Sequence, residues 1–165
     1  MRDIAPEPLT AEAFAPFGSV IEASESAVQV TINQGHAVRY DRLADVDVAD
    51  RGGTGVISLF RATPLDSPVL KLFERHPLGS QSFMPLGGGP YLVAVAPAGD
   101  FDAASVRVFR AGAHQGVHYR KGTWHHFLLT LEAESDFLVV DRAGPGDNLD
   151  EIALAPSEAI RVRGA

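Results

Sequence analysis

Glycine and proline interrupt this chain so often that no long segment after Gly18 keeps a helical period. The 165 residues include 16 glycines and 11 prolines, and both residue types disfavour helix interiors. Between them lie apolar runs of four to eight residues, namely GVISLFRA, YLVAVAP, SVRVFRA, HHFLLTL and DFLVVDR. Such runs are typical of β-strands. Because the chain has too little helix for parallel βαβ units, an all-β fold is expected, a single antiparallel β-barrel.

The two ends of the chain carry the other structural signals. Thr10 is a suitable N-cap, and a short helix from about Ala11 to Ala15 would end before Pro16. The C-terminal segment EAIRVRGA is expected either to pair as a last strand or to pack on the outside. No internal repeat or linker divides the chain, so residues 1–165 are expected to form one domain with a substantial core.

Charge and cysteine content narrow the range of functions. The net charge is −7, with acidic residues spread along the chain, so a nucleic-acid partner is not expected. The chain has no cysteine, which excludes disulfides, thiolate metal sites and a cysteine nucleophile. The N-terminus has no apolar signal-peptide core, and no apolar run approaches the roughly 18 residues of a membrane span. A cytoplasmic protein without a membrane partner is therefore expected.

Two polar clusters stand out among the apolar runs. FERHPLGSQSFMP contains Glu74 and His76, which share one face if the segment is a strand, followed by Gln81. GVHYRKGTWHHF contains three of the six histidines. Alternation along HHFLLTL places His125 with a phenylalanine and two leucines at the mouth of an apolar interior, and His126 on the opposite face. Imidazole, carboxylate and amide groups together suit a divalent metal.

The spacing of these residues resembles the two motifs of the cupin barrel, His-x-His-(x3 or x4)-Glu-(x6)-Gly and Pro-x-Gly-(x2)-His. Glu74 and His76 stand at the two histidine positions of the first motif. Gln81 stands at its glutamate position, and Gly88 follows at the required distance. KGTWH supplies Gly-x-x-His and places His125 at the last ligand position. The chain departs from the pattern at three positions. Glu74 replaces the first histidine, Gln81 replaces the glutamate, and Arg120 replaces the proline of the second motif.

Longer strings carry a more specific resemblance. FERHPLGSQSFMPL, GVHYRKGTWHHFL and DFLVVDR closely resemble the ureidoglycolate lyase family, as do FAPFGSVIE and INQGHAVRY, so the resemblance extends from about Leu9 to Asn148. It implies a homodimeric cupin that cleaves a small anion, ureidoglycolate, into glyoxylate and urea. Family members have been described with a divalent metal such as nickel. Outward-facing Trp124 and apolar outer strand positions would offer surface for the second subunit.

Residues of the two clusters are also candidates for ligand and acid-base roles, the ligands from their motif positions and the acid-base groups from their nearness to His125 in sequence. The expected metal ligands are Glu74, His76 and His125. The metal would bind the hydroxyl and carboxylate oxygens of the substrate. His118, or an uncoordinated Glu74, would take the hydroxyl proton, and Lys121 or Tyr119 would protonate the urea nitrogen. A metal-free pocket that works with an arginine clamp and a histidine acid-base group is the alternative.

An anionic substrate also needs cationic and amide groups around it. The candidates for substrate binding are Arg61, Arg75, Asn33 and Gln81. Arginine can bind a carboxylate through two hydrogen bonds. Arg61 has the parity of Ile57 and Leu59, so it points inward if those two residues are core. Asn33 would contact the ureido group or make a turn, and Gln81 would bind substrate rather than metal.

Two other functions fit a cupin pattern. A metal-dependent cupin dioxygenase or isomerase would usually keep three histidines, or two histidines and a glutamate, and the Glu-His-Gln-His set of this chain differs from both. A non-enzymatic, ligand-sensing cupin normally accompanies a DNA-binding domain. The 165 residues leave no room for such a domain.

Overall fold

The computed structural model describes residues 1–66 and 69–164, and strands make up most of its regular structure. Its one α-helix within these residues, α1 (Ala11–Phe14), lies where it was expected, and the Thr10 side chain caps it by accepting a hydrogen bond from the Ala13 N–H. Three short 3₁₀ turns are η1 (Asn33–Gly35), η2 (Asp50–Gly52) and η3 (Ala103–Ser105). Among the described residues, none of these helices has the length or hydropathy needed to span a bilayer.

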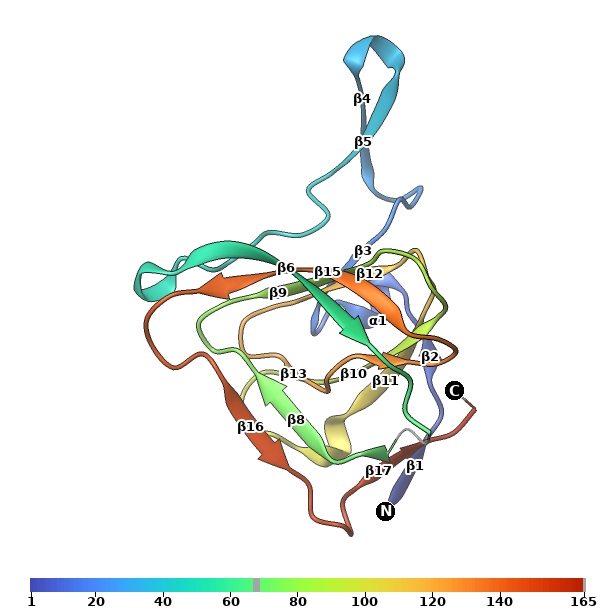
Figure 1. Cartoon of the computed structure of the whole chain (residues 1–165), viewed down its shortest axis with the longest axis vertical. Helices are drawn as coiled ribbons and strands as arrows, with labels where there is room; N and C mark the ends of the chain where they lie inside the picture. The colour runs from blue at the N-terminus through green and yellow to red at the C-terminus, as the bar shows by residue number, and fades with distance from the viewer. Residues whose placement is uncertain (67–68, 165) are drawn as a thin grey trace.

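Two large sheets form the body of the molecule (Figure 1). The seven-stranded sheet consists of β16 (Asp150–Ala153), β8 (Leu72–Arg75), β13 (Trp124–His125), β10 (Tyr91–Ala96), β11 (Arg107–Ala111) and β2 (Glu7–Pro8) in this order, with β14 (Leu129–Thr130) also on β10. The five-stranded sheet consists of β3 (Gly18–Ile21), β12 (Gly116–Tyr119), β9 (Gln81–Pro85), β15 (Ser135–Ala143) and β6 (Thr54–Ala62) in this order. All their pairings are antiparallel except that of β11 with β2.

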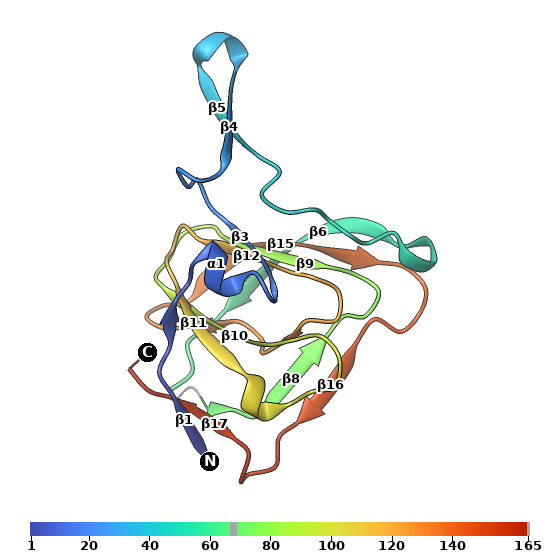
Figure 2. The ribbon, with the colours of Figure 1, turned by 180° about the vertical axis from the view of Figure 1, so that it is seen from behind.

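The remaining strands form two smaller sheets. A three-stranded sheet contains β1 (Arg2–Ile4), β17 (Ile160–Val162) and β7 (Val69–Leu70), so EAIRVRGA does contribute a last strand, as one of the two expectations had it. A separate hairpin is made of β4 (Val28–Ile32) and β5 (Ala37–Asp41). Figures 1 and 2 show from both sides that this hairpin projects away from the body of the molecule.

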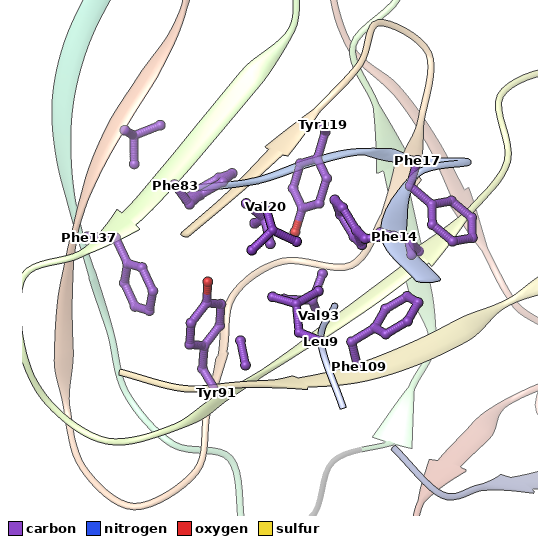
Figure 3. Close-up of a cluster of buried hydrophobic side chains, with 14 residues drawn as sticks. Leu9, Phe14, Phe17, Val20, Phe83, Tyr91, Val93, Phe109, Tyr119 and Phe137 are labelled. Atoms are coloured by element: carbon purple, nitrogen blue, oxygen red, sulfur yellow. The ribbon is translucent and has the colours of Figure 1, made fainter. Parts of the chain in front are cut away.

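Strand β10 is buried on both of its faces and organises the two hydrophobic cores. Its residues Tyr91, Val93 and Val95 point into the core between the two large sheets, which α1 closes at one end (Figure 3). Alternate residues, such as Leu92, point into a second core that the three-stranded sheet covers. Because a strand with both faces buried reads as a continuous apolar run, YLVAVAP has no alternation. The predicted antiparallel all-β barrel with a short N-terminal helix is confirmed.

The orientation of β6 differs from the expectation. Ile57 and Leu59 are 72% and 66% exposed, so they are not core, and Arg61 points outward with them. The inward face carries Phe60, whose ring centroid lies 5.8 Å from that of Phe83. Because β6 is the edge strand of its sheet and is apolar on both faces, the alternation of its sequence could not identify the buried face.

Trp124 faces away from the barrel interior, as expected, but it is covered rather than exposed. Only 6% of its surface is accessible, and it packs in the second core beside Phe101. Its indole N–H donates to the Gly99 carbonyl, and the guanidinium of Arg75 lies 4.6 Å from the ring centroid. Trp124 therefore offers no surface for a second subunit, and the expectation that it does is wrong.

The two-sided burial of β10 predicts a large cost for truncating Leu92. Leu92→Ala should lower the free energy of unfolding by about 2–5 kcal/mol, because it removes buried methyl groups and leaves a cavity in the second core. The matched control is Leu86→Ala, at a position that is 56% exposed, where a change within about 0.5 kcal/mol is expected. Urea unfolding at pH 7 measures both variants. Equal effects in the two would contradict the assignment of β10 as the central element.

Candidate functional site

A cavity of about 410 Å³ opens between the end of β6 and the strands β8, β12 and β13. Its walls are largely aromatic and aliphatic, and they include Phe60, Phe83 and Phe127. The polar groups on its surface come from a few side chains, among them Glu74 and His125. A concave, mostly apolar pocket with a small number of convergent polar groups is typical of a small-molecule site.

Pairing of β8 with β13 brings the two sequence clusters together. The register places His125 directly opposite Glu74, and their Nε2 and Oε1 atoms are 3.3 Å apart. His76 follows on the same side, with its Nε2 atom 4.0 Å from the same oxygen and its ring centroid 5.2 Å from that of His125. One donor atom from each of the three residues lies within 4.8 Å of the others. Residues 49 positions apart in sequence thus share one point in space.

Backbone contacts fix the orientation of both imidazole rings. The Nδ1 atom of His76 lies 2.7 Å from the Asn148 carbonyl, and that of His125 lies 3.1 Å from the Thr123 carbonyl. A carbonyl can only accept, so each Nδ1 carries the proton. Each Nε2 atom then lies toward Glu74, and both are buried without a hydrogen-bond partner. Carbonyl contacts of this kind fix the tautomer of metal-binding histidines in proteins.

The electrostatics of this set call for a positive charge among the three residues. His125 beside Glu74 holds the pKa of that carboxyl below its usual value, although burial acts in the opposite direction. That effect needs a proton on the Nε2 atom of His125; without this proton, two nitrogen lone pairs face the carboxyl group. A proton on Nε2 of His125 would give the Glu74 carboxylate a hydrogen-bond donor. A divalent cation could instead bind the carboxylate and both Nε2 atoms at once. Ligand atoms about 2.1 Å from one ion lie at most about 4.2 Å apart, so small side-chain movements would suffice. Glu74, His76 and His125 fit a metal.

The turn before β13 links the two motifs. Gly122 has a φ of +76°, which is the left-handed region that glycine occupies without strain. Its N–H donates to the carbonyl of His76 over 3.0 Å. The glycine of the Gly-x-x-His pattern therefore has a structural reason: it turns the chain so that His125 enters β13 beside the first cluster.

Tyr119 is the aromatic neighbour of the histidine pair. Its ring stacks on that of His125, with centroids 4.4 Å apart and an angle of 17° between the planes. It lines the cavity from β12. Burial raises the pKa of the phenol well above its usual value, so Tyr119 remains protonated and able to donate a hydrogen bond.

The structure places His118 and Lys121 outside this cavity, contrary to the expectation that they act in it. Alternation along β12 turns His118 to the side opposite Tyr119, where its Nδ1 atom lies 2.8 Å from the Ser82 hydroxyl. Lys121 forms ion pairs with Asp47 at 2.9 Å and Asp50 at 2.8 Å. Both residues line a different cavity of about 370 Å³. Nearness in sequence to His125 was a poor guide because neighbouring strand residues face opposite ways.

Both arginines are paired with carboxylates, and only Arg61 of the two lines the cavity. Arg75 lies on the face of β8 opposite Glu74 and is bound to Asp150 at 2.8 Å. Arg61 lies at the rim of the cavity, where two hydrogen bonds of 2.7 Å and 2.9 Å tie it to Asp136. The inward orientation expected for Arg61 is wrong for the reason given above: β6 turns its other face to the core.

The two amide candidates have different positions. Gln81 on β9 is opposite Tyr119 in the strand register, so it faces the interior. It is buried, its amide nitrogen lies 3.4 Å from Asp141, and its amide oxygen has no partner. Asn33 lies at the tip of the β4–β5 hairpin, exposed to solvent, and not in the cavity of its own chain.

His126 is a cavity residue that the sequence pattern assigned to the opposite face. It is 4% exposed, lines the cavity and packs edge-on against Phe73. Burial lowers its pKa, so the ring is neutral near pH 7. Strand β13 ends at His125, and strict alternation therefore stops there. The His-His doublet itself is the signal that could have drawn attention to it.

Comparison with known proteins gives the same family along nearly the whole chain. The family model described as ureidoglycolate lyase matches residues 1–161. A protein named ureidoglycolate lyase from Burkholderia mallei (strain NCTC 10229) is 52% identical over 158 residues, which is 95% of this chain and 92% of the relative. One of the same name from Pseudomonas putida (strain W619) is 51% identical, over 92% of this chain and 91% of the relative.

Solved structures show a looser similarity. A dTDP sugar isomerase from Desulfovibrio desulfuricans G20 has a TM-score of 0.47 at 16% identity, over 87% of this chain and 89% of that one. An oxalate decarboxylase from Bacillus subtilis has a TM-score of 0.41 at 13% identity, over 66% of this chain and 27% of that one. Similarity at this level does not extend to function. The family match over residues 1–161, together with relatives that are half identical, shows that this chain belongs to the ureidoglycolate lyase family.

Proposed function

We propose that this protein is a ureidoglycolate lyase, which cleaves ureidoglycolate into glyoxylate and urea. The observation that carries the proposal is the convergence of Glu74, His76 and His125, of which Glu74 and His125 line the cavity. The proposal draws its substrate from the family to which the chain belongs. The protein would act as a homodimer in the cytoplasm on this small anion.

The reaction needs two proton movements and no water. In ureidoglycolate one carbon carries a hydroxyl, a carboxylate and a urea nitrogen. When the hydroxyl loses its proton, its oxygen forms the carbonyl of glyoxylate, the carbon–nitrogen bond breaks, and the departing nitrogen takes a proton to complete urea. A catalyst must therefore hold the substrate, accept one proton and donate another.

The residues of the cavity can perform these tasks. Glu74, His76 and His125 would hold a divalent cation, nickel being one candidate. When bound, the cation lowers the pKa of a coordinated hydroxyl and offsets the developing charge. In the alternative without a metal, the carboxylate of Glu74 is uncoordinated and can accept the hydroxyl proton, since its pKa is lowered. Tyr119 is protonated and beside His125, so its phenol can donate toward the urea nitrogen. The aromatic walls limit the access of water.

The first prediction tests the metal set. His125→Ala should lose about 10²-fold or more in urea release from ureidoglycolate, because it removes one of three ligands and the partner of Glu74. Bound divalent metal, measured by elemental analysis of the purified protein, should fall in parallel. The control is His114→Ala, since His114 is 80% exposed and lies outside the cavity. Full activity of the wild type after exhaustive chelation would refute the metal assignment and favour acid-base action by His125.

The second prediction concerns His118, which the structure separates from the cavity. Burial lowers the pKa of His118. Because the folded state then binds fewer protons than the unfolded chain, this contribution to stability is complete above the ordinary histidine pKa of about 6.5 and declines as the pH falls below it. His118→Gln should therefore lose less stability than the wild type between pH 7.5 and pH 5.5.

Urea unfolding at the two pH values measures this effect. His114→Gln, at an exposed position, should behave as the wild type does. The same His118→Gln protein should keep most of its lyase activity at pH 7.5, since His118 contacts Ser82 and not the Glu74 cluster. A loss of activity by more than about 10²-fold would restore His118 as the general base.

A further inference from the structure

The β4–β5 hairpin exposes apolar residues that nothing in its own chain covers within the described residues. This arm, defined as residues 28–41, projects from the body of the molecule (Figures 1 and 2). Every residue of β4 is exposed, and Val28 and Val30 are 66% and 42% accessible. On β5, Val38 is 50% accessible. A lone two-stranded hairpin is at best marginally stable in water, so an arm of this composition needs a surface to pack on.

Strand β6 is a second uncovered feature of the same chain. It has nine residues and, in the part of the chain that the structure describes, a sheet neighbour on one side only. Ile57 and Leu59 on its outer face lie opposite Val140 and Leu138 of β15, which makes a continuous apolar patch. A long, apolar edge strand invites pairing with another chain unless it is covered.

We propose that the arm of one protomer packs along β6 of a second copy, and that Asn33 and Gln34 at its tip complete the cavity of that copy. This inference rests on the proposed function for its substrate. A two-fold axis would repeat the contact, so each protomer gives one arm and receives one, and both uncovered features of the chain are covered at once. The extended arm would lie beside an extended edge, which is the arrangement of strand addition.

Charge favours a second copy of this chain as the occupant. The arm contains Arg39, His36 and a single carboxylate, Asp41, so the net charge of −7 is carried by the rest of the chain. Arg39 is 61% exposed. Near the end of β6, Glu134 and Asp136 present an acidic rim around Arg61, with side chains 54% and 37% exposed. Arg39 is paired with Asp41 of the same arm at 2.6 Å, so the arm is neutral and can approach this rim where an acidic surface would be repelled.

The position of the tip follows from the layout of β6. The last residues of β6, Phe60, Arg61 and Ala62, form part of the cavity wall, so a segment that follows this strand arrives at the cavity. A five-residue strand such as β4 is about 17 Å long, so it covers about half of the nine-residue β6, which is about 30 Å long. The residues that the structure describes around the cavity include carboxylate, imidazole and phenol groups but no side-chain amide.

The arm tip can supply those amides. A ureido group presents both N–H donors and a carbonyl acceptor, and side-chain amides match both. Asn33 and Gln34 are adjacent, exposed, and have φ angles of 52° and 59°. Positive φ angles at successive residues are common in the tight turns that connect hairpin strands, and asparagine tolerates them well. Both residues are exposed at the turn of the arm, so their amides are accessible to a second copy.

Subunit complementation tests whether the site is shared. In the first variant, Asn33→Gly and Gln34→Gly remove the amides, and glycine tolerates the positive φ angles. This protein should lose about tenfold or more in activity. The second variant is His125→Ala. Heterodimers isolated with two affinity tags contain one intact cavity facing one intact arm, so they should recover about half of the wild-type rate per dimer. Failure of the heterodimer to recover activity would overturn the proposal.

A cross-link tests the arm independently of activity, since the native chain has no cysteine. The double variant Gln34→Cys, Thr63→Cys joins the tip to the cavity rim of the second copy, and oxidation should give a covalent dimer on a non-reducing gel. The matched control Gln34→Cys, Glu158→Cys places the second thiol between β16 and β17, and should remain monomeric on the gel. Equal cross-linking in both, or none in either, would reject arm exchange.

The two tests separate the two proposals. If the Gln34→Cys, Thr63→Cys variant forms the cross-link while the wild type releases no urea from ureidoglycolate, the arm is kept and the lyase is rejected. A wild-type protein that releases urea but sediments as a monomer at micromolar concentration would keep the lyase and reject the arm.

Discussion

The pairing of β8 with β13 is the constraint on which the site depends. It sets Glu74 opposite His125, with 3.3 Å between their facing atoms. His76 completes the set because it lies two residues beyond Glu74. The Nδ1 proton of each histidine is donated to a backbone carbonyl, so the Nε2 atoms that face Glu74 can only accept hydrogen bonds. Because the carboxylate also only accepts, the three residues need a cation or a proton between them. A shift of the register by one residue would turn His125 to the other core.

The two hydrophobic cores hold that register. Strand β10 pairs with β13 and is buried on both faces, so Val95 faces the barrel interior beside His125 while Ala96 and Trp124 face the second core. The stacked Tyr119 ring then covers His125 from the opposite sheet. Glu74, His76 and His125 are therefore held in place from two sheets. The apolar side chains around them reduce hydrogen bonding to bulk water.

The same sheets explain why the molecule has exposed apolar residues on its surface. The edge strand β6 contributes one face to the core and leaves Ile57 and Leu59 exposed. The arm adds further apolar surface at a distance from the body. These exposed apolar residues are the basis of the proposed contact with a second copy. If the arm packs on β6 of a second copy, dimer formation and completion of the active site are the same event.

The sequence alone determined the fold class, the capped first helix and the Glu-His and Gly-x-x-His clusters, because these depend on local signals: glycine and proline spacing, a threonine cap, and short motifs. It could not determine which face of β6 is buried, since both faces are apolar, nor the position of His118, which strand alternation carries away from its sequence neighbours. Trp124 was expected on the surface and is covered by segments distant in sequence. Those outcomes were decided by tertiary structure, because a side chain's environment is set by the strands that pack against it and not by its own neighbours in the chain.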